Sequence, residues 1–159
     1  MMNRWALAAS VVLVLSACAG VEQTTAFRST ETQLFATRQA ASLQCPTPPD
    51  CDRVWNFTRR YVEAHSSTQV TRFTADVIET AQPHFAGEVY LWASRMASSD
   101  GGWVIRLKAM CKDMYDSDGG PGWQYGACAS KILEIEKGFR LYAFPPNSPD
   151  TPTLPADPL

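Results

Sequence analysis

The chain has 159 residues, with 14 basic and 16 acidic side chains and a formal net charge of −2. That length allows one domain and not comfortably two. Because no basic patch or stripe stands out, the composition does not indicate a nucleic-acid partner. We therefore expect one small domain with no role in DNA or RNA binding.

The chain begins with a segment typical of exported proteins. Its first residues carry one basic side chain, Arg4, and an apolar run follows over residues 6–15. Two small residues come next, immediately before Cys18. A basic start, a short apolar core and a small-residue exit describe a secretory signal peptide, and the run is shorter than the roughly 20 residues of a membrane-spanning helix. We expect residues 1–17 to be removed on export.

The sequence Leu15-Ser16-Ala17-Cys18 resembles the lipobox of bacterial lipoproteins, in which an aliphatic residue and two small residues precede an invariant cysteine. The resemblance covers this segment alone, and we recognise no family for the folded domain. It implies that Cys18 becomes the mature N-terminus and carries two or more acyl chains such as palmitate, which attach a protein stably to a membrane. Since Ala19 and not an aspartate follows, it also implies the periplasmic face of the outer membrane in a Gram-negative host.

Two segments of the exported chain are predicted to lie outside the folded domain. Residues 18–44 are rich in Thr, Gln, Ala and Ser, which is typical of a flexible tether with at most a helical stretch near residues 31–43. Residues 145–159 hold six prolines, which predict an extended, mobile tail without helix or sheet. The folded domain is therefore predicted over residues 45–144.

Within this domain the sequence predicts a helix from about Asp50 to His65. Two prolines precede Asp50, whose carboxylate is typical of a helix N-cap. Several side chains then recur at helical spacing along one face, until Ser66 and Ser67 end the helix. They are Val54, Phe57, Thr58, Tyr61, Val62 and His65.

Three strands are predicted next. The first covers residues 68–80, where a break at Ala75-Asp76 indicates either a bulge or two shorter strands. The second covers residues 88–96, and residues 98–102 connect it by a hairpin to the third, over residues 103–112. The third strand alternates apolar and mostly basic side chains, which predicts one buried and one solvent-exposed sheet face.

A last helix is predicted from about Tyr125 to Tyr142, with an apolar stripe along one side. Both helices have an apolar face, and the sheet has one face to cover. We therefore expect an α+β domain in which two helices pack on one face of a three-stranded antiparallel meander, in the order helix-β-β-β-helix.

Once Cys18 is assigned to lipid, an even number of cysteines remains, which predicts two disulfides in an oxidising compartment. They are Cys45, Cys51, Cys111 and Cys128. Cys111 and Cys128 lie on apolar faces that are expected to meet, so we favour this pair. Cys45 and Cys51 flank a short proline-containing loop and form the second pair, whereas the main alternative joins Cys51 to Cys111.

No constellation of catalytic or metal-binding residues is recognised. The two histidines, His65 and His84, have no partner in the sequence that indicates a general base, and no nucleophile or phosphate-loop motif is present. Asp113, Asp116 and Asp118 depart from the spacing of a calcium loop and are interpreted as a polar loop. No zinc-like Cys/His spacing occurs either, so we expect no catalytic residue, no cofactor and no metal.

Tyr90 and Trp92 are the candidate binding residues. Both lie on one face of the second predicted strand, opposite a face of small and aliphatic residues. If the aliphatic face packs against the helices, the aromatic pair lies on the outer face of the sheet near Arg106 and Lys108. In the alternative orientation the aromatic pair is in the core. Exposed aromatic residues beside charges are typical of surfaces that bind proteins or sugars.

From these features we expect a non-catalytic envelope module that is held at the membrane by lipid on Cys18 and binds an envelope protein or a cell-wall partner. The alternative is an envelope hydrolase or an inhibitor-like accessory protein with a site assembled from distant residues. A passive structural role is a third reading. Exposed Tyr90, Trp92 and Arg106 favour binding, whereas a deep pocket that joins a histidine to carboxylates favours the enzyme.

Overall fold

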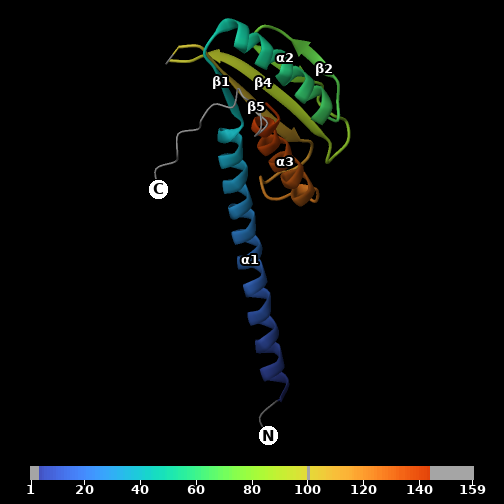
Figure 1. Cartoon of the computed structure of the whole chain (residues 1–159). Helices are drawn as coiled ribbons and strands as arrows, with labels where there is room; N and C mark the ends of the chain where they lie inside the picture. Colours follow the sequence, from blue (N-terminus) through green and yellow to red (C-terminus); the bar gives the residue numbers. More distant parts are fainter. Residues whose placement is uncertain (1–3, 100, 144–159) are drawn as a thin grey trace.

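The computed structural model describes residues 4–99 and 101–143, with side chains from residue 22 onward. The predicted tail over residues 145–159 lies outside the described residues, as do the side chains of the predicted signal peptide and of Cys18. The described part contains three helices and five strands (Figure 1). In chain order they are α1 (Arg4–Ala40), β1 (Ser42–Cys45), α2 (Pro48–His65), β2 (Val70–Phe73), β3 (Val77–Thr80), β4 (Val89–Ala97), β5 (Trp103–Cys111) and α3 (Tyr125–Ala143).

All five strands belong to one antiparallel sheet, in the order β1-β5-β4-β3-β2. The long hairpin of β4 and β5 forms its centre, with Val89 opposite Cys111 at the end distant from the turn. Gly102 in the turn has a φ of 74°, and a Cβ there would come within 2.4 Å of the carbonyl oxygen of Cys45. Glycine is therefore required by the left-handed backbone and by the close approach of β1.

The predicted α+β class is confirmed, but the sheet has five strands instead of the predicted three, and three helices accompany it. Residues 68–80 contain two strands, β2 and β3. They are joined by a tight turn in which Thr74 Oγ1 accepts a hydrogen bond from the N–H of Val77 (3.0 Å). The fifth strand, β1, comes from the segment that was expected to be a tether.

Residues 22–44 belong to the segment expected as a flexible tether with at most a helical stretch near residues 31–43, but the structure has helix from residue 22 to Ala40 and strand from Ser42. α1 continues to Ala40, and β1 pairs with β5 so that Leu43 lies opposite Ile105. Four side chains of this segment are buried: Leu34, Thr37, Ala41 and Leu43. The tether prediction is corrected accordingly, and the folded unit begins within α1. The physical reason is that α1 buries few apolar residues, so its amphipathic pattern is weak in the sequence.

α2 begins with a cap that differs from the predicted one. The N-cap is Thr47 and not Asp50, because Thr47 Oγ1 accepts a hydrogen bond from the N–H of Asp50 (3.4 Å). The two prolines then occupy the first helical positions, where the backbone N–H groups have no partner within the helix. The prolines therefore belong to the helix and do not precede it.

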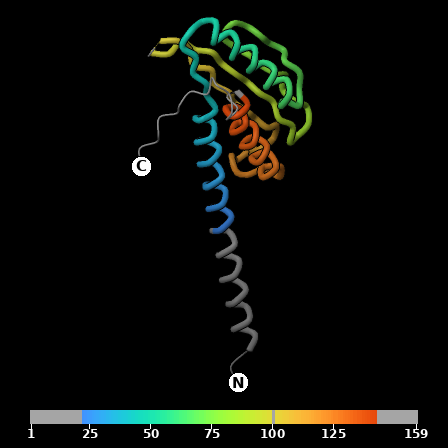
Figure 2. Tube along the Cα trace, in the orientation of Figure 1, coloured from blue at the N-terminus to red at the C-terminus, as the bar shows by residue number. Residues whose placement is uncertain are grey.

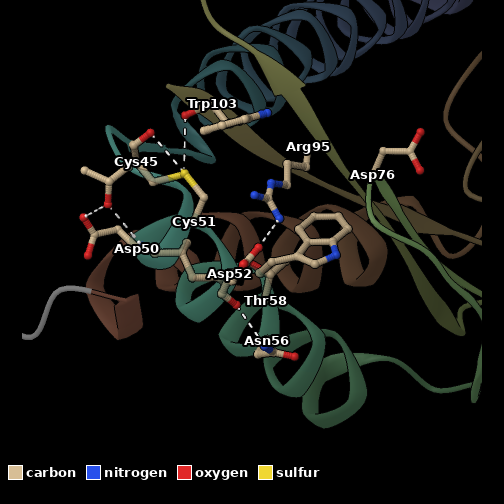
Figure 3. A network of polar contacts seen from close by, with 12 residues as sticks. Cys45, Asp50, Cys51, Asp52, Asn56, Thr58, Asp76, Arg95 and Trp103 are labelled. Carbon is tan, nitrogen blue, oxygen red and sulfur yellow. Dashed lines mark hydrogen bonds and ion pairs between the residues drawn. A yellow bond between two sulfur atoms is a disulfide. The ribbon is translucent and has the colours of Figure 1, made fainter. Parts of the chain in front are cut away.

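Both predicted disulfides are present, and the alternative pairing is not. Cys45 and Cys51 close the connection between β1 and α2, with a Cα–Cα distance of 5.2 Å. Cys111 and Cys128 join β5 to α3, with a Cα–Cα distance of 5.7 Å. The start of α2 is also held to the sheet by an ion pair between Asp52 and Arg95 (Figure 3). α2 and α3 are therefore each covalently linked to a strand of the sheet.

The helices cover one face of the sheet. Side chains that alternate along β4 and β5 are buried beneath α2 and α3: Leu91, Ala93, Ile105, Leu107 and Ala109. Tyr61 of α2 donates a hydrogen bond from its hydroxyl to the carbonyl of Ile135 in α3 (2.8 Å), which joins these two helices. α1 packs along α3 (Figure 2).

Candidate functional site

The second face of the sheet, which we call the outer face, carries the predicted binding residues. Val89, Leu91 and Ala93 of β4 are buried against the helices. Because successive side chains of a strand point to opposite faces, Tyr90 and Trp92 lie on the outer face, where both are half-buried. Of the two orientations left open by the sequence, the structure has the one that places the aromatic pair outside the core.

The strand register brings the four predicted residues together. Trp92 lies directly opposite Lys108, and Ser94 lies opposite Arg106. Directly opposite residues in an antiparallel pair share a face, with Cβ atoms about 5 Å apart. Tyr90 is the next outer-face residue along β4, opposite Met110. The aromatic pair therefore adjoins two cationic side chains.

Two further outer-face residues were missed by the sequence analysis. Met110 lies beside Tyr90, and Glu79 of β3 lies opposite Trp92 on its other side. Glu79 forms an ion pair with Arg72 of β2 (2.9 Å). The position of Glu79 opposite Trp92 could not be predicted, because β2 and β3 were not separated in the prediction and the register of β3 against β4 could not be assigned.

The outer face combines apolar area with cationic charge. Neither Arg106 nor Lys108 forms an ion pair with any residue that the structure describes. Tyrosine, tryptophan and arginine are enriched at the energetic centres of protein interfaces, because a large rigid ring contributes contact area at a small loss of conformational entropy. The arrangement suits a ligand that offers an apolar surface and acidic groups.

The two histidines are not brought together with carboxylates in the described part of the chain. His65 lies within hydrogen-bond distance of the Tyr61 carbonyl through Nδ1 (2.9 Å) and stacks on the Tyr61 ring. His84 is exposed in the connection before β4. A pocket of about 560 Å³ lies between α2 and β2, where Arg59 and Glu63 form an ion pair (2.8 Å). No histidine lines this pocket.

In the acidic loop between β5 and α3, a carboxylate accepts hydrogen bonds from backbone N–H groups of the same loop. Asp116 Oδ1 accepts hydrogen bonds from the N–H groups of Asp118 (3.1 Å) and Gly120 (2.7 Å), which fixes the turn. Asp113 pairs with Lys112 (3.4 Å). Within the described residues there is no group of three or more side chains that could hold a metal ion.

A buried ion pair, missed by the sequence analysis, lies on the helix-covered side of the sheet. Glu136 of α3 is only 1% exposed, and its Oε1 accepts hydrogen bonds from Arg38 Nε (3.3 Å) and from the N–H of Ala109 (3.0 Å). Arg38 Nη2 in turn donates to the carbonyl of Ala109 (3.4 Å). Burial raises the pKa of Glu136, while the hydrogen bond from Ala109 and the charge of Arg38 oppose the rise.

A second polar cluster fixes α1 to the start of α3. The carboxylate of Glu31 accepts hydrogen bonds from the hydroxyls of Tyr125 (2.7 Å) and Tyr115 (2.9 Å). Burial and the bond to Glu31 raise the pKa of Tyr115 to about 12 and raise that of Tyr125 as well. The ring of Phe27 packs on Tyr125, with centroids 5.0 Å apart. α1 therefore contacts the domain from Phe27 to its end.

Comparisons with protein-family models, curated proteins and solved structures found no match for this chain. Among the described residues, no helix is both long and apolar enough to cross a membrane.

Proposed function

We propose that this chain is a lipid-anchored protein of the cell envelope whose domain binds a partner through the outer face of its sheet. The lipobox at Leu15-Ser16-Ala17-Cys18 supports the anchor, and Ala19 after it supports a position on the periplasmic face of the outer membrane. The two disulfides are consistent with an oxidising compartment. Binding is supported by one observation above all: on the face that the helices leave open, Tyr90 and Trp92 lie beside Arg106 and Lys108, which form no ion pair within the described residues.

The chemistry of the outer face favours a protein partner with an acidic segment. A half-buried tryptophan already has a restricted side chain, so covering it in a complex costs little further entropy. Lys108 lies opposite Trp92 on β5 and Arg106 is the next outer-face residue of that strand, and both would pair with carboxylates of the partner, which sets orientation and speeds association. A cell-wall ligand with acidic groups would meet the same residues and is distinguished by experiment.

Site-specific photo-cross-linking in cells tests this proposal. A photoreactive amino acid at Met110 places the probe on the outer face and leaves the aromatic and cationic side chains unchanged. The matched control carries the same probe at Arg60, which is exposed on α2. We expect a discrete cross-linked protein from position 110 that is missing from position 60. Equal labelling from both positions, or none from either, would contradict a protein-binding face, and a shift to cell-wall material would identify the other ligand class.

The alternative of a hydrolase or inhibitor-like accessory protein requires a pocket that gathers a histidine with carboxylates. The pocket beside α2 holds the Arg59–Glu63 ion pair and Phe73, with no histidine in its lining. No observation in the described residues favours the alternative specifically, so the binding function alone is proposed.

A further inference from the structure

We infer that the domain rests on the membrane surface through the end at which α3 begins, with Trp123 in the lipid headgroup layer. This inference rests on the lipid anchor proposed above. It goes beyond anchoring, because it assigns a second contact with the membrane and so fixes which end of the domain faces the lipid.

The direction of α1 identifies the end of the domain nearest to the anchor. Phe27 of α1 packs on Tyr125 at the start of α3, and Arg38 bonds Glu136 further along the same helix. α1 and α3 therefore run in the same direction, with the start of α3 level with the part of the α1 contact closest to Cys18. In Figure 1 this end of the domain lies on the side toward which α1 continues.

The distance between the anchor and this end is short. The helical segment from Cys18 to Phe27 is about 14 Å long at 1.5 Å per residue. The headgroup layer on one side of a bilayer is roughly 5–7 Å thick. A lipid on Cys18 therefore keeps the start of α3 near the membrane, and a tilt of α1 brings the two into contact.

This end presents the two most exposed large hydrophobic side chains of the described residues. Trp123 is 81% exposed just before α3, and Phe85 is 73% exposed before β4. Their loops adjoin, since a Cβ on Gly87 would lie 3.1 Å from the side chain of Gln124. Indole and phenyl rings at a membrane interface bury apolar area while the indole N–H stays hydrated. The membrane interface would therefore bury the two rings that the fold leaves exposed at this end.

The charges of this end indicate which lipids it fits. Asp116 and Asp118 are exposed in the loop that leads to Trp123, and Lys112 is paired with Asp113. A surface without a net excess of basic residues is not attracted to anionic lipids. The contact should therefore form on zwitterionic phospholipids through the aromatic rings and should be insensitive to salt.

Tryptophan quenching by brominated lipids tests the inference on the full mature protein. The protein is purified from membranes, its mass is measured to establish lipid on Cys18, and it is placed in phosphatidylcholine vesicles with bromine near the top of the acyl chains. We expect bromine to reduce the tryptophan emission of the wild type, and Trp123→Phe to abolish most of this reduction. Trp92→Phe removes an outer-face indole instead, and should leave the bromine-dependent loss of tryptophan emission unchanged.

The outcomes separate the inference from the function on which it rests. Lipidated wild type and Trp123→Phe that are quenched equally would overturn the membrane contact and leave the anchor intact. Protein without lipid on Cys18 would overturn both. Quenching that is lost in Trp92→Phe and kept in Trp123→Phe would place the outer face, and not the start of α3, against the bilayer.

Discussion

Glu136 occupies a place on the apolar stripe of α3 where a hydrophobic side chain would be expected, one helical turn after Ile132. Its carboxylate accepts a hydrogen bond at an edge of the sheet where no strand pairs with β5. β1 begins with Ser42 opposite Arg106, so the rest of β5 has no strand on that side, and the N–H and the carbonyl of Ala109 would lack partners there. Glu136 accepts from the N–H and Arg38 donates to the carbonyl, which satisfies both groups.

Glu136→Ala should lower the free energy of unfolding by about 1–3 kcal/mol, because it leaves the Ala109 N–H buried without an acceptor. Arg38 remains partly in solvent, so the loss should be smaller than for a fully buried pair. Urea unfolding monitored by circular dichroism measures the change. A variant as stable as the wild type would show that the edge of β5 does not need the carboxylate.

The raised pKa of Glu136 predicts a pH dependence with a definite sign. The folded state holds the proton more tightly than the unfolded state, so this group contributes most below its ordinary pKa, near 4.3, and the contribution is lost as the pH rises through the raised pKa. Glu136→Gln keeps an acceptor and does not titrate. Its stability relative to the wild type should therefore increase from about pH 4 to about pH 8. A difference that stays constant across urea titrations at these pH values would refute the shift.

The sequence predicted the four candidate binding residues but could not orient them. Tyr90 and Trp92 alternate with Val89, Leu91 and Ala93, and both sets are apolar enough to form a core face. A period of two identifies the sets but not which one the helices cover. That choice depends on the partner strand: Leu107 and Ala109 share the face of Ala93 and Leu91, whereas Lys108 shares that of Trp92.

At the scale of elements, prediction succeeded where the pattern was long and failed where it was short. The hairpin of β4 and β5 has nine residues in each strand, with regular alternation in β5, and both strands were found. β1 has four residues, too few for a periodic pattern to be recognised. α1 was read as a tether because Thr and Gln separate its buried positions, such as Leu34 and Ala41. Its packing on α3 and the hydrogen bond from Arg38 to β5 show that it is part of the fold.

Because α1 and β1 belong to the fold, a fragment that starts at Cys45 should be unstable. It lacks the strand that pairs with β5 and the buried side chains of Leu34, Ala41 and Leu43. A fragment of residues 22–143 should unfold cooperatively on heating, whereas residues 45–143 should show no cooperative transition. Circular dichroism melts compare the two fragments. Equal melting temperatures would show that residues 22–44 are a tether and do not stabilise the fold.

The two disulfides should stabilise the domain unequally. Cys111 and Cys128 are separated by 17 residues, and Cys45 and Cys51 by 6. In the chain-entropy model the first cross-link contributes about 3 kcal/mol and the second about 2 kcal/mol. Replacing each pair by serine and measuring urea unfolding gives both values. A larger loss from the 45–51 pair would mean that its task in fixing the start of α2 outweighs the entropy of the closed loop.

At the scale of the whole molecule, α1 would set the position of both proposed surfaces relative to the lipid anchor. The end of the domain with Trp123 lies toward Cys18, and the outer face is turned away from the helices. A domain held by lipid and by an aromatic contact would present Tyr90 and Trp92 sideways to the membrane in a constant orientation. A partner could then approach along the membrane surface without competing with the lipid contact.

Charge reversal on the outer face should weaken partner binding without unfolding the domain. Lys108→Glu should reduce cross-linking from position 110 several-fold, because it places a carboxylate beside Trp92 against an acidic partner. Lys137→Glu on the exposed side of α3 is the control, since it changes the net charge equally. Both variants should stay within about 0.5 kcal/mol of the wild type in unfolding free energy. Equal loss of cross-linking in both would indicate a general charge effect.

The intact mass of the mature protein extracted from membranes tests the lipid anchor most directly. We predict a chain that begins at Cys18 and carries a diacylglyceryl group, with or without a further acyl chain. Cys18→Ser should retain residues 1–17 and carry no lipid. A wild-type protein that keeps residues 1–17, or that begins at Cys18 without lipid, would contradict the anchor and with it the proposed place of this domain at the membrane.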